Sequence, residues 1–319
     1  MGKSTFSDKL DTIFVMSAEA IDDHGEDNFC CITSGKTAIL GSFDGCGGLG
    51  SRVYGEFQGK SGAYLSSRLA SGAICDWYMN KATEAIPGSQ EIITGMREYL
   101  MKNYDTCESM TGTGLKIKGS MVRKLPTTAA IALASEHGEQ AIGIDVVWAG
   151  DSRVYMLNSK GLVQLSEDDL DDVDPFINLS SDAVLTNVLS SDGNFVLHHK
   201  AYEFEMPCII ISATDGCFGY LTSPMEFEYL LLNAIESTNS PIELRQKLQE
   251  EIVDITGDDS TLGFMSFGYG SFEDMKNDFI GRKYDLEKKY IDEINRNRGS
   301  VDLKSMWQEY RASYERYLN

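Results

Sequence analysis

The sequence predicts an α+β sandwich built from antiparallel sheets and long helices. Nine short segments are rich in Ile, Val, Phe and Thr and are bounded by Gly, Asp, Ser or Asn, which is typical of strands. Most of them lie too close to their neighbours for a helical crossover, so antiparallel pairing is favoured. Long helical stretches occur in two places, after the first three strands and before the last one. This order of strands and helices suggests the sandwich.

The expected elements follow one another along the chain. Strands are expected at residues 12–17, 28–33 and 37–43, and helical stretches at 51–80 and 90–107 follow them. Five more strands are expected at residues 128–134, 142–149, 153–157, 195–204 and 208–213. Helices at 224–237 and 241–253 then lead into a last strand at 261–267. Residues 166–194 are expected to form an irregular, acidic flap.

The pattern changes near residue 270. From Ser271 onward apolar residues recur at helical spacing, and Ser300 is expected to cap a second helix. We therefore predict a main domain over residues 1–270 and a C-terminal helical extension over 271–319. The extension either packs on its own chain or serves self-association or partner binding. Its aromatic row is the expected contact face, and consists of Trp307, Tyr310, Tyr314 and Tyr317.

Composition and charge limit the classes of function. The formal net charge of the 319 residues is −21, and all of the excess acid lies in the first 270 residues. This charge opposes binding to nucleic-acid backbones and to anionic membranes. Seven cysteines without a CxxC pair are typical of reduced thiols, and no signal peptide or apolar run of roughly 20 residues is expected. The sequence therefore predicts a cytoplasmic protein.

The Gly-rich segment 37–52 allows three kinds of chemistry. Its GxGxxG pattern follows a strand, but no second strand ending in an acidic residue follows about 20 residues later, so we reject dinucleotide binding. Cys46 and Arg52 have the C-x5-R spacing of a cysteine phosphatase, in a strand–loop–helix context. Asp44 beside that loop disfavours a thiolate. The third possibility is a metal site that includes Asp44.

Four short acidic segments support the metal site. They are residues 25–28, 43–45, 213–216 and 257–260, each at the end of a predicted strand or in a turn. Alone, each is explained as a turn or a solvated edge. Together they place carboxylate oxygens at strand ends that antiparallel pairing can bring side by side. Oxygen ligands are those that Mg²⁺ and Mn²⁺ prefer, and bound cations would neutralise part of the acidic charge.

These segments, in this order, resemble the motifs of the metal-dependent Ser/Thr protein phosphatases, the PPM or type 2C family. The resemblance covers nearly all of residues 12–268. The matching segments are Gly25-Glu26-Asp27, Asp44-Gly45-Cys46-Gly47-Gly48, Pro126-Thr127-Thr128, Gly150-Asp151-Ser152-Arg153, Ser212-Ala213-Thr214-Asp215-Gly216 and Asp258-Asp259-Ser260-Thr261. The resemblance implies two stacked antiparallel sheets flanked by helix pairs, an α-β-β-α sandwich, with a PPM-type catalytic domain over residues 1–270.

The resemblance also implies a mechanism and a set of site residues. A water bridging two Mn²⁺ or Mg²⁺ ions would hydrolyse phosphoserine or phosphothreonine on proteins, in signalling with a Ser/Thr kinase or its targets. Asp44 and Asp27 would be catalytic, with Asp44 bridging both ions. Asp259 would orient the metal ligands without binding the ions itself. The implied metal ligands are Glu26, Asp44, the Gly45 carbonyl, Asp215 and Asp258.

One departure from the family pattern matters for function. The family commonly carries a phosphate-binding Arg four residues before the Glu, and Asp22 stands at that position. Arg52 is either a substitute phosphate ligand, because its planar fork matches phosphate oxygens, or a surface residue. The missing Arg leaves a second hypothesis, a pseudophosphatase that keeps the fold as a binding or scaffolding module. Its signature would be lost ligand acids, and none of the four is lost.

Overall fold

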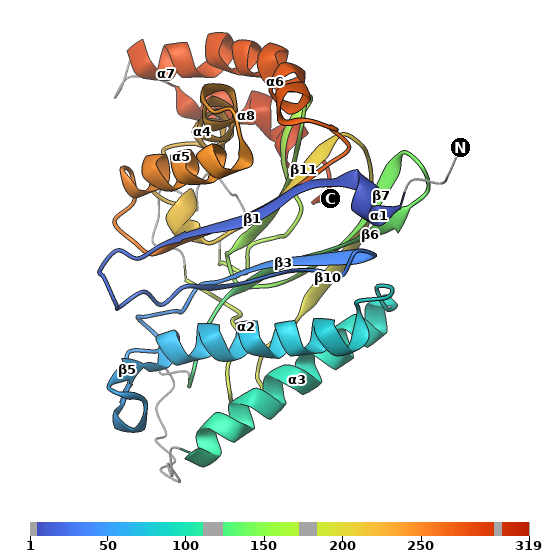
Figure 1. Cartoon of the computed structure of the whole chain (residues 1–319). Coiled ribbons are helices and arrows are strands. Elements are labelled where there is room, and N and C mark those ends of the chain that lie inside the picture. The colour runs from blue at the N-terminus through green and yellow to red at the C-terminus, as the bar shows by residue number, and fades with distance from the viewer. Residues whose placement is uncertain (1–4, 111–123, 172–183, 297–301, 319) are drawn as a thin grey trace.

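Two five-stranded antiparallel sheets lie face to face between two layers of helices (Figure 1). The computed structural model describes residues 5–110, 124–171, 184–296 and 302–318. Helices α2 (Gly62–Lys81) and α3 (Ser89–Met110) cover one sheet, and the helices from α4 to α8 cover the other. The predicted α-β-β-α sandwich with a C-terminal helical extension is confirmed.

The first sheet lies beneath the C-terminal helices. Its strand order is β1 (Leu10–Ala18), β12 (Ser260–Phe267), β11 (Cys208–Ala213), β8 (Arg153–Asn158) and β9 (Gly161–Gln164). The second sheet packs on α2 and α3. Its order is β10 (His198–Glu205), β7 (Ala141–Ala149), β6 (Ala129–His137), β3 (Thr37–Phe43) and β2 (Asn28–Thr33). All nine expected strands are formed, and β9 was not predicted.

The expected helix over residues 51–80 is wrong in its first third. That stretch forms the strand pair β4 (Val53–Tyr54) and β5 (Lys60–Ser61) around a short 3₁₀ helix, η1 (Gly55–Phe57). Gly59 takes a φ of +78°, which glycine adopts without strain and which ends any helix there. Ser61 then caps α2, because its side chain accepts a hydrogen bond from the Tyr64 amide. Arg52 is consequently not at the start of a helix.

The two sheets approach closely over a core of small side chains. Ala130, Ala132 and Ala134 of β6 are fully buried between the sheets. A Cβ on Gly263 of β12 would lie 2.5 Å from Leu40 of β3, so glycine is needed for the sheets to meet there. At this contact the Ser42 hydroxyl of β3 donates to the Ser212 carbonyl of β11 over 3.0 Å. The ends of β3 and β11 are thereby held together.

The remaining helices lie over the first sheet. They are α4 (Pro224–Ser237), α5 (Pro241–Val253), α6 (Phe272–Leu286), the π-helical turn η3 (Glu287–Ile291), α7 (Asp292–Arg296) and α8 (Leu303–Tyr314), while α1 (Phe6–Lys9) precedes β1. Asp302 caps α8 by accepting from the Ser305 amide; the expected cap, Ser300, lies outside the described residues. No helix in the described ranges is long and apolar enough to span a membrane.

The aromatic row of the C-terminal extension packs on its own chain. Trp307, Tyr310 and Tyr314 are at most 2% exposed and share one hydrophobic core with α4 and α5. Tyr317 stacks edge-on against Tyr202 of β10, with ring centroids 5.7 Å apart. Of the two alternatives for this face, the structure therefore favours packing on the parent chain. The domain boundary at residue 270 stays a prediction.

One buried ion pair fastens the extension to the main domain. Glu228 of α4 is fully buried and accepts hydrogen bonds from Arg282 of α6 at 2.6 and 2.7 Å. It also accepts one from the Tyr310 hydroxyl of α8 at 2.6 Å. The Arg282 cation compensates the charge of the Glu228 carboxylate, and the three hydrogen bonds replace its contacts with water. Without these partners, burying the carboxylate would destabilise the fold.

We predict that Arg282→Met destabilises the protein by about 3–5 kcal/mol, because it leaves the Glu228 carboxylate buried without its cation. Urea unfolding followed by circular dichroism measures this. The triple change Glu228→Leu, Arg282→Met and Tyr310→Phe should restore most of the loss. As a control, Lys36→Ala in the exposed pair with Glu84 should leave stability unchanged. A single Arg282→Met variant as stable as the wild type would contradict the proposed role of the pair.

Candidate active site

The acidic motifs come together at one end of the two sheets. Asp27 directly precedes β2 and Asp44 directly follows β3, and the ladder that pairs Asn28 with Phe43 brings them side by side. Asp215 follows β11, and the Thr214 amide donates to the Thr261 carbonyl at the start of β12. Antiparallel pairing thus places the ends of four strands at one site.

A fourth acid, Asp151, joins them from the turn between β7 and β8. The register pairs Arg153 of β8 with Ala213 of β11, two residues before Asp215. The sequence analysis gave Asp151 no site role. Its signal was the Gly150-Asp151-Ser152-Arg153 segment, which is one of the motifs that resemble the family but which by itself predicts only a turn between two strands.

These carboxylates raise one another's pKa values. Burial raises the pKa of Asp44 well above its usual range, and the charges of Asp215 and Asp27 raise it further. Burial also raises the pKa of Asp27 to about 8, although Thr214 donates to it, and raises that of Asp215 to about 6. The pKa of Asp151 is raised by burial and by Asp215. Four interacting acids therefore share one site, in which Asp27 is buried and Asp44, Asp151 and Asp215 are partly buried.

The donor atoms fit divalent cations. Asp27 Oδ1 and Asp151 Oδ1 are buried and have no hydrogen-bond partner among the described residues. An uncompensated buried carboxylate is costly, and a cation is the natural partner of several at once. Within the described ranges, no group of three or more His, Cys, Asp and Glu side chains is arranged to hold a metal ion by itself. Mg²⁺ does not require one, because it keeps several waters and takes one or two carboxylates.

The Gly-rich turn packs directly on Glu26. A Cβ on Gly47 would lie 2.5 Å from Glu26 Oε2, and one on Gly45 would lie 2.7 Å from the Ala63 carbonyl at the start of α2. Glycine is required at position 45 because the close atoms belong to the backbone, whereas a side chain at position 47 would displace the Glu26 carboxylate. Burial raises the pKa of Glu26, whose Oε1 also accepts a hydrogen bond from the Ser61 hydroxyl. The GxGxxG spacing thus has a packing reason unrelated to dinucleotides.

Asp258 and Asp259 precede β12 and lie beside the loop that runs from Ala20 to Glu26. Asp259 accepts from the backbone amides of Glu26 at 2.6 Å and of Ala20 at 2.8 Å, so its carboxylate fixes this loop. Asp258 is exposed, and its charge raises the pKa of Asp215. This puts Asp258 at the rim of the acidic group.

The Pro126-Thr127-Thr128 segment holds the backbone of Asp44. The Asp44 carbonyl accepts from the Thr127 hydroxyl at 2.6 Å and from the Thr128 amide at 2.8 Å. The Thr128 hydroxyl in turn shares a 2.6 Å hydrogen bond with the Ser152 hydroxyl, next to Asp151. Two motifs that lie far apart in sequence are therefore joined directly beneath Asp44.

Arg68 is a residue that the sequence analysis missed. From α2 it donates a 3.1 Å hydrogen bond to the Gly25 carbonyl and lies over the Tyr64 ring, 3.4 Å from its centroid. Its positive charge lowers the pKa of Glu26, opposing the larger effect of burial. The sequence feature that could have pointed to Arg68 is its place as a single basic residue in an Ala/Ser/Leu-rich helix.

The geometry removes the cysteine-phosphatase alternative. Cys46 is buried, and burial together with Asp44 raises its thiol pKa well above the usual range. A thiolate nucleophile is disfavoured there. The helix whose N-terminus would face a phosphate begins at Gly62, ten residues beyond Arg52. The Arg52 guanidinium lies 4.9 Å from the centroid of the Tyr54 ring.

Solved structures of known proteins share this fold. No protein-family model and no curated protein sequence matches the chain. The serine/threonine phosphatase PstP/Ppp of Mycobacterium tuberculosis superposes with a TM-score of 0.54 at 17% identity, over 81% of this chain and 98% of that one. Stp1 of Staphylococcus aureus gives 0.57 at 14% identity, over 84% and 98%. The PstP catalytic domain in complex with two manganese ions gives 0.52 at 15%, over 81% and 98%. The chain has the fold of the PPM-type Ser/Thr phosphatases.

We predict that the metal-free protein becomes less stable as pH rises from about 5 to about 8. The folded-state pKa values of about 6 for Asp215 and about 8 for Asp27 exceed the usual Asp value of 3.8. The folded protein therefore binds more protons than the unfolded chain in this range, and stability is lost as the acids ionise. Thermal unfolding in excess chelator measures the trend.

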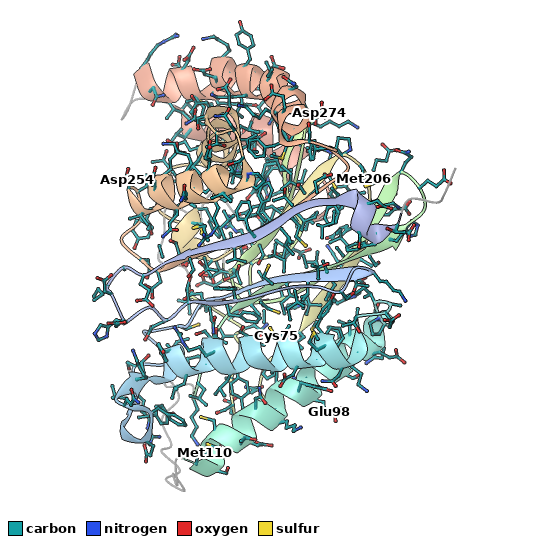
Figure 2. All side chains as sticks on the ribbon, viewed as in Figure 1. Cys75, Glu98, Met110, Met206, Asp254 and Asp274 are labelled. Atoms are coloured by element: carbon teal, nitrogen blue, oxygen red, sulfur yellow. The ribbon has the colours of Figure 1, made fainter. Side chains whose placement is uncertain are left out.

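Two variants and added Mn²⁺ test whether these acids cause the pH dependence. Asp27→Asn should raise the metal-free midpoint at high pH and flatten its dependence, whereas Asp254→Asn at the exposed end of α5 (Figure 2) should change neither. Added Mn²⁺ should raise the midpoint more at high than at low pH, since protonated acids do not bind cations. A midpoint that rises with pH in chelator would contradict the assignment.

Proposed function

We propose that this protein is a metal-dependent phosphatase that hydrolyses phosphoserine or phosphothreonine on other proteins. The observation that carries the proposal is the convergence of Asp27, Asp44, Asp151 and Asp215 at one end of a PPM-type sandwich. Two of their carboxylate oxygens have no hydrogen-bond partner in the part of the chain that the structure describes. A buried group of acids is unfavourable on its own and becomes favourable once cations bind.

The ligands that we propose for two Mn²⁺ or Mg²⁺ ions are oxygen atoms only. They belong to Glu26, Asp44, the Gly45 carbonyl, Asp215 and Asp258. When bound, such ions supply an activated water and offset the negative charge of the phosphoryl oxygens. The manganese complex of PstP, which shares the fold, supports this choice of metal.

The protein's own residues orient the reacting groups. Thr127 and Thr128 fix the backbone of Asp44, so its carboxylate is held in place before substrate arrives. Asp27 accepts from the Thr214 hydroxyl through Oδ2, whereas its Oδ1 has no hydrogen-bond partner among the described residues. Asp27 Oδ1 would orient the attacking water and accept its proton. Asp259 keeps Glu26 in position through the loop backbone. No side-chain nucleophile is needed.

Arg52 is our candidate for binding the substrate phosphate. Asp22, at the position of the family's Arg, is exposed and negatively charged, so it cannot serve. The Arg52 guanidinium is stacked on Tyr54, which limits its rotamers while its N–H groups remain able to bind phosphate oxygens.

The substrates that we propose are phosphorylated proteins in the cytoplasm, such as a Ser/Thr kinase or its targets in a signalling pathway. The likeness to proteins described as serine/threonine phosphatases supports this class. The net charge of −21 argues against nucleic acid and anionic membranes as partners.

The exchange of the family's Arg for Asp22 favours the second candidate, a pseudophosphatase that binds partners without turnover.

Asp44→Asn and Asp215→Asn should each lower Mn²⁺-dependent hydrolysis of 4-nitrophenyl phosphate by at least roughly 100-fold, because each removes a charged ligand. Cys46→Ser should keep nearly wild-type activity, since a buried, protonated thiol takes no part. Initial rates with and without excess EDTA measure both. Full activity in EDTA with loss on Cys46→Ser would indicate a cysteine phosphatase. No hydrolysis with any divalent cation would favour the pseudophosphatase.

Arg52→Ala should raise KM for a phosphopeptide several-fold while kcat and the Mn²⁺ activation constant stay unchanged. Arg52→Lys should lie between, because an ammonium keeps the charge but not the planar fork. Lys81→Ala, at the exposed end of α2, is the matched control for lost positive charge. If KM is the same in Arg52→Ala and the wild type, another group binds the phosphate.

A further inference from the structure

Helix α2 contacts the segment that leads into β2 through side chains one helical turn apart. Residues 67, 71 and 75 lie on one face of the helix, since i and i+4 positions are neighbours. Each contacts the backbone or side chain of the segment 26–30. The pairs are Ser67 with the Glu26 carbonyl, Ser71 with the Phe29 carbonyl and Cys75 with Cys30. This row runs from the proposed active site to the middle of β2.

The last pair in the row is two thiols in direct contact. Cys30 Sγ and Cys75 Sγ lie 2.7 Å apart, with Cys30 buried and Cys75 half-buried on α2 (Figure 2). β2 is an edge strand of its sheet, so this contact lies near the surface. The hydrogen bond with Cys30 lowers the pKa of Cys75, whereas the pKa values of Cys30 and Cys31 are raised. Cys75 is therefore the more reactive thiol of the group.

We propose that Cys30 and Cys75 form an oxidative modification site that closes a reversible disulfide between β2 and α2. The oxidant is hydrogen peroxide. The Cys75 thiolate attacks one peroxide oxygen and becomes a sulfenic acid, and the other oxygen leaves as water after taking a proton. The Cys30 sulfur then attacks the sulfenic sulfur, forming the S–S bond and releasing a second water. Two thiols are oxidised and one hydrogen peroxide is reduced, so the electrons balance.

The disulfide would hold the Glu26 segment against α2. Cys30 is four residues after Glu26, and Cys75 is two turns after Ser67, which binds the Glu26 carbonyl. A covalent bond at this end of the row reduces the freedom of β2 to separate from the helix. The site concerns thiol chemistry and goes beyond the proposed phosphatase activity, so it holds or fails independently of it.

The test treats the reduced full-length protein with hydrogen peroxide and then alkylates it in denaturant. We expect two of its seven thiols to escape alkylation and a tryptic peptide pair joined between Cys30 and Cys75, both reversed by dithiothreitol. Amide hydrogen exchange of residues 25–33 should slow in the oxidised form, and its thermal midpoint should rise by several degrees. Neither measurement requires enzymatic activity.

Single variants decide the assignment. Cys75→Ser should abolish the linked peptide and the stabilisation, whereas Cys31→Ser, beside Cys30 in β2, should leave both intact. A link between Cys31 and Cys75, or peroxide-treated protein in which all seven thiols are still alkylated, overturns the proposal. If the link forms but hydrogen exchange at 25–33 is unchanged, the proposed effect on the Glu26 segment is wrong.

Discussion

Four carboxylates packed together at one end of the sandwich impose the constraint on which the rest of the structure depends. Asp27, Asp44, Asp151 and Asp215 each have a pKa above the usual value because burial and mutual repulsion disfavour ionisation. Such a group destabilises the fold unless cations neutralise it. The surrounding structure must therefore supply the stability that this arrangement lacks, and hold the acids in place before any cation binds.

The contact between the two sheets provides much of that support. The Ser42 and Ser212 hydroxyls lie 2.9 Å apart, and Ser212 also donates to the Ala130 carbonyl at 2.7 Å, so three strands are joined where the acids begin. Asp44 follows Ser42 by two residues and Asp215 follows Ser212 by three. Because these hydroxyls are fully buried and hydrogen-bonded across the sheets, a relative shift of the sheets would leave polar groups unsatisfied.

The C-terminal helices contact the strand β8, which begins two residues after Asp151. The Tyr314 ring of α8 packs against the Tyr155 ring of β8, with centroids 6.3 Å apart, and the Tyr155 hydroxyl accepts from Arg153 at 3.4 Å. Arg153 is buried and forms an ion pair with Asp168 at 2.6 Å. The extension therefore touches Tyr155, which is four positions after Asp151 and hydrogen-bonded to Arg153. The C-terminal extension lies outside the matched motifs, yet its aromatic side chains share one hydrophobic core with the first sheet.

Local sequence patterns determined most elements and the identities of the acids. The ranges of β2, β3, α4 and α5 follow from apolar periodicity and their Gly, Ser and Pro boundaries, and the four acidic segments stand out as turns at strand ends. Only the tertiary structure decided that the short strands β4 and β5 replace a helix before residue 62, that Asp151 joins the other acids, and that Cys30 contacts Cys75. Each depends on contacts between segments far apart in the chain, which no local pattern encodes, because strand register and helix docking are set by the packing of the whole sandwich.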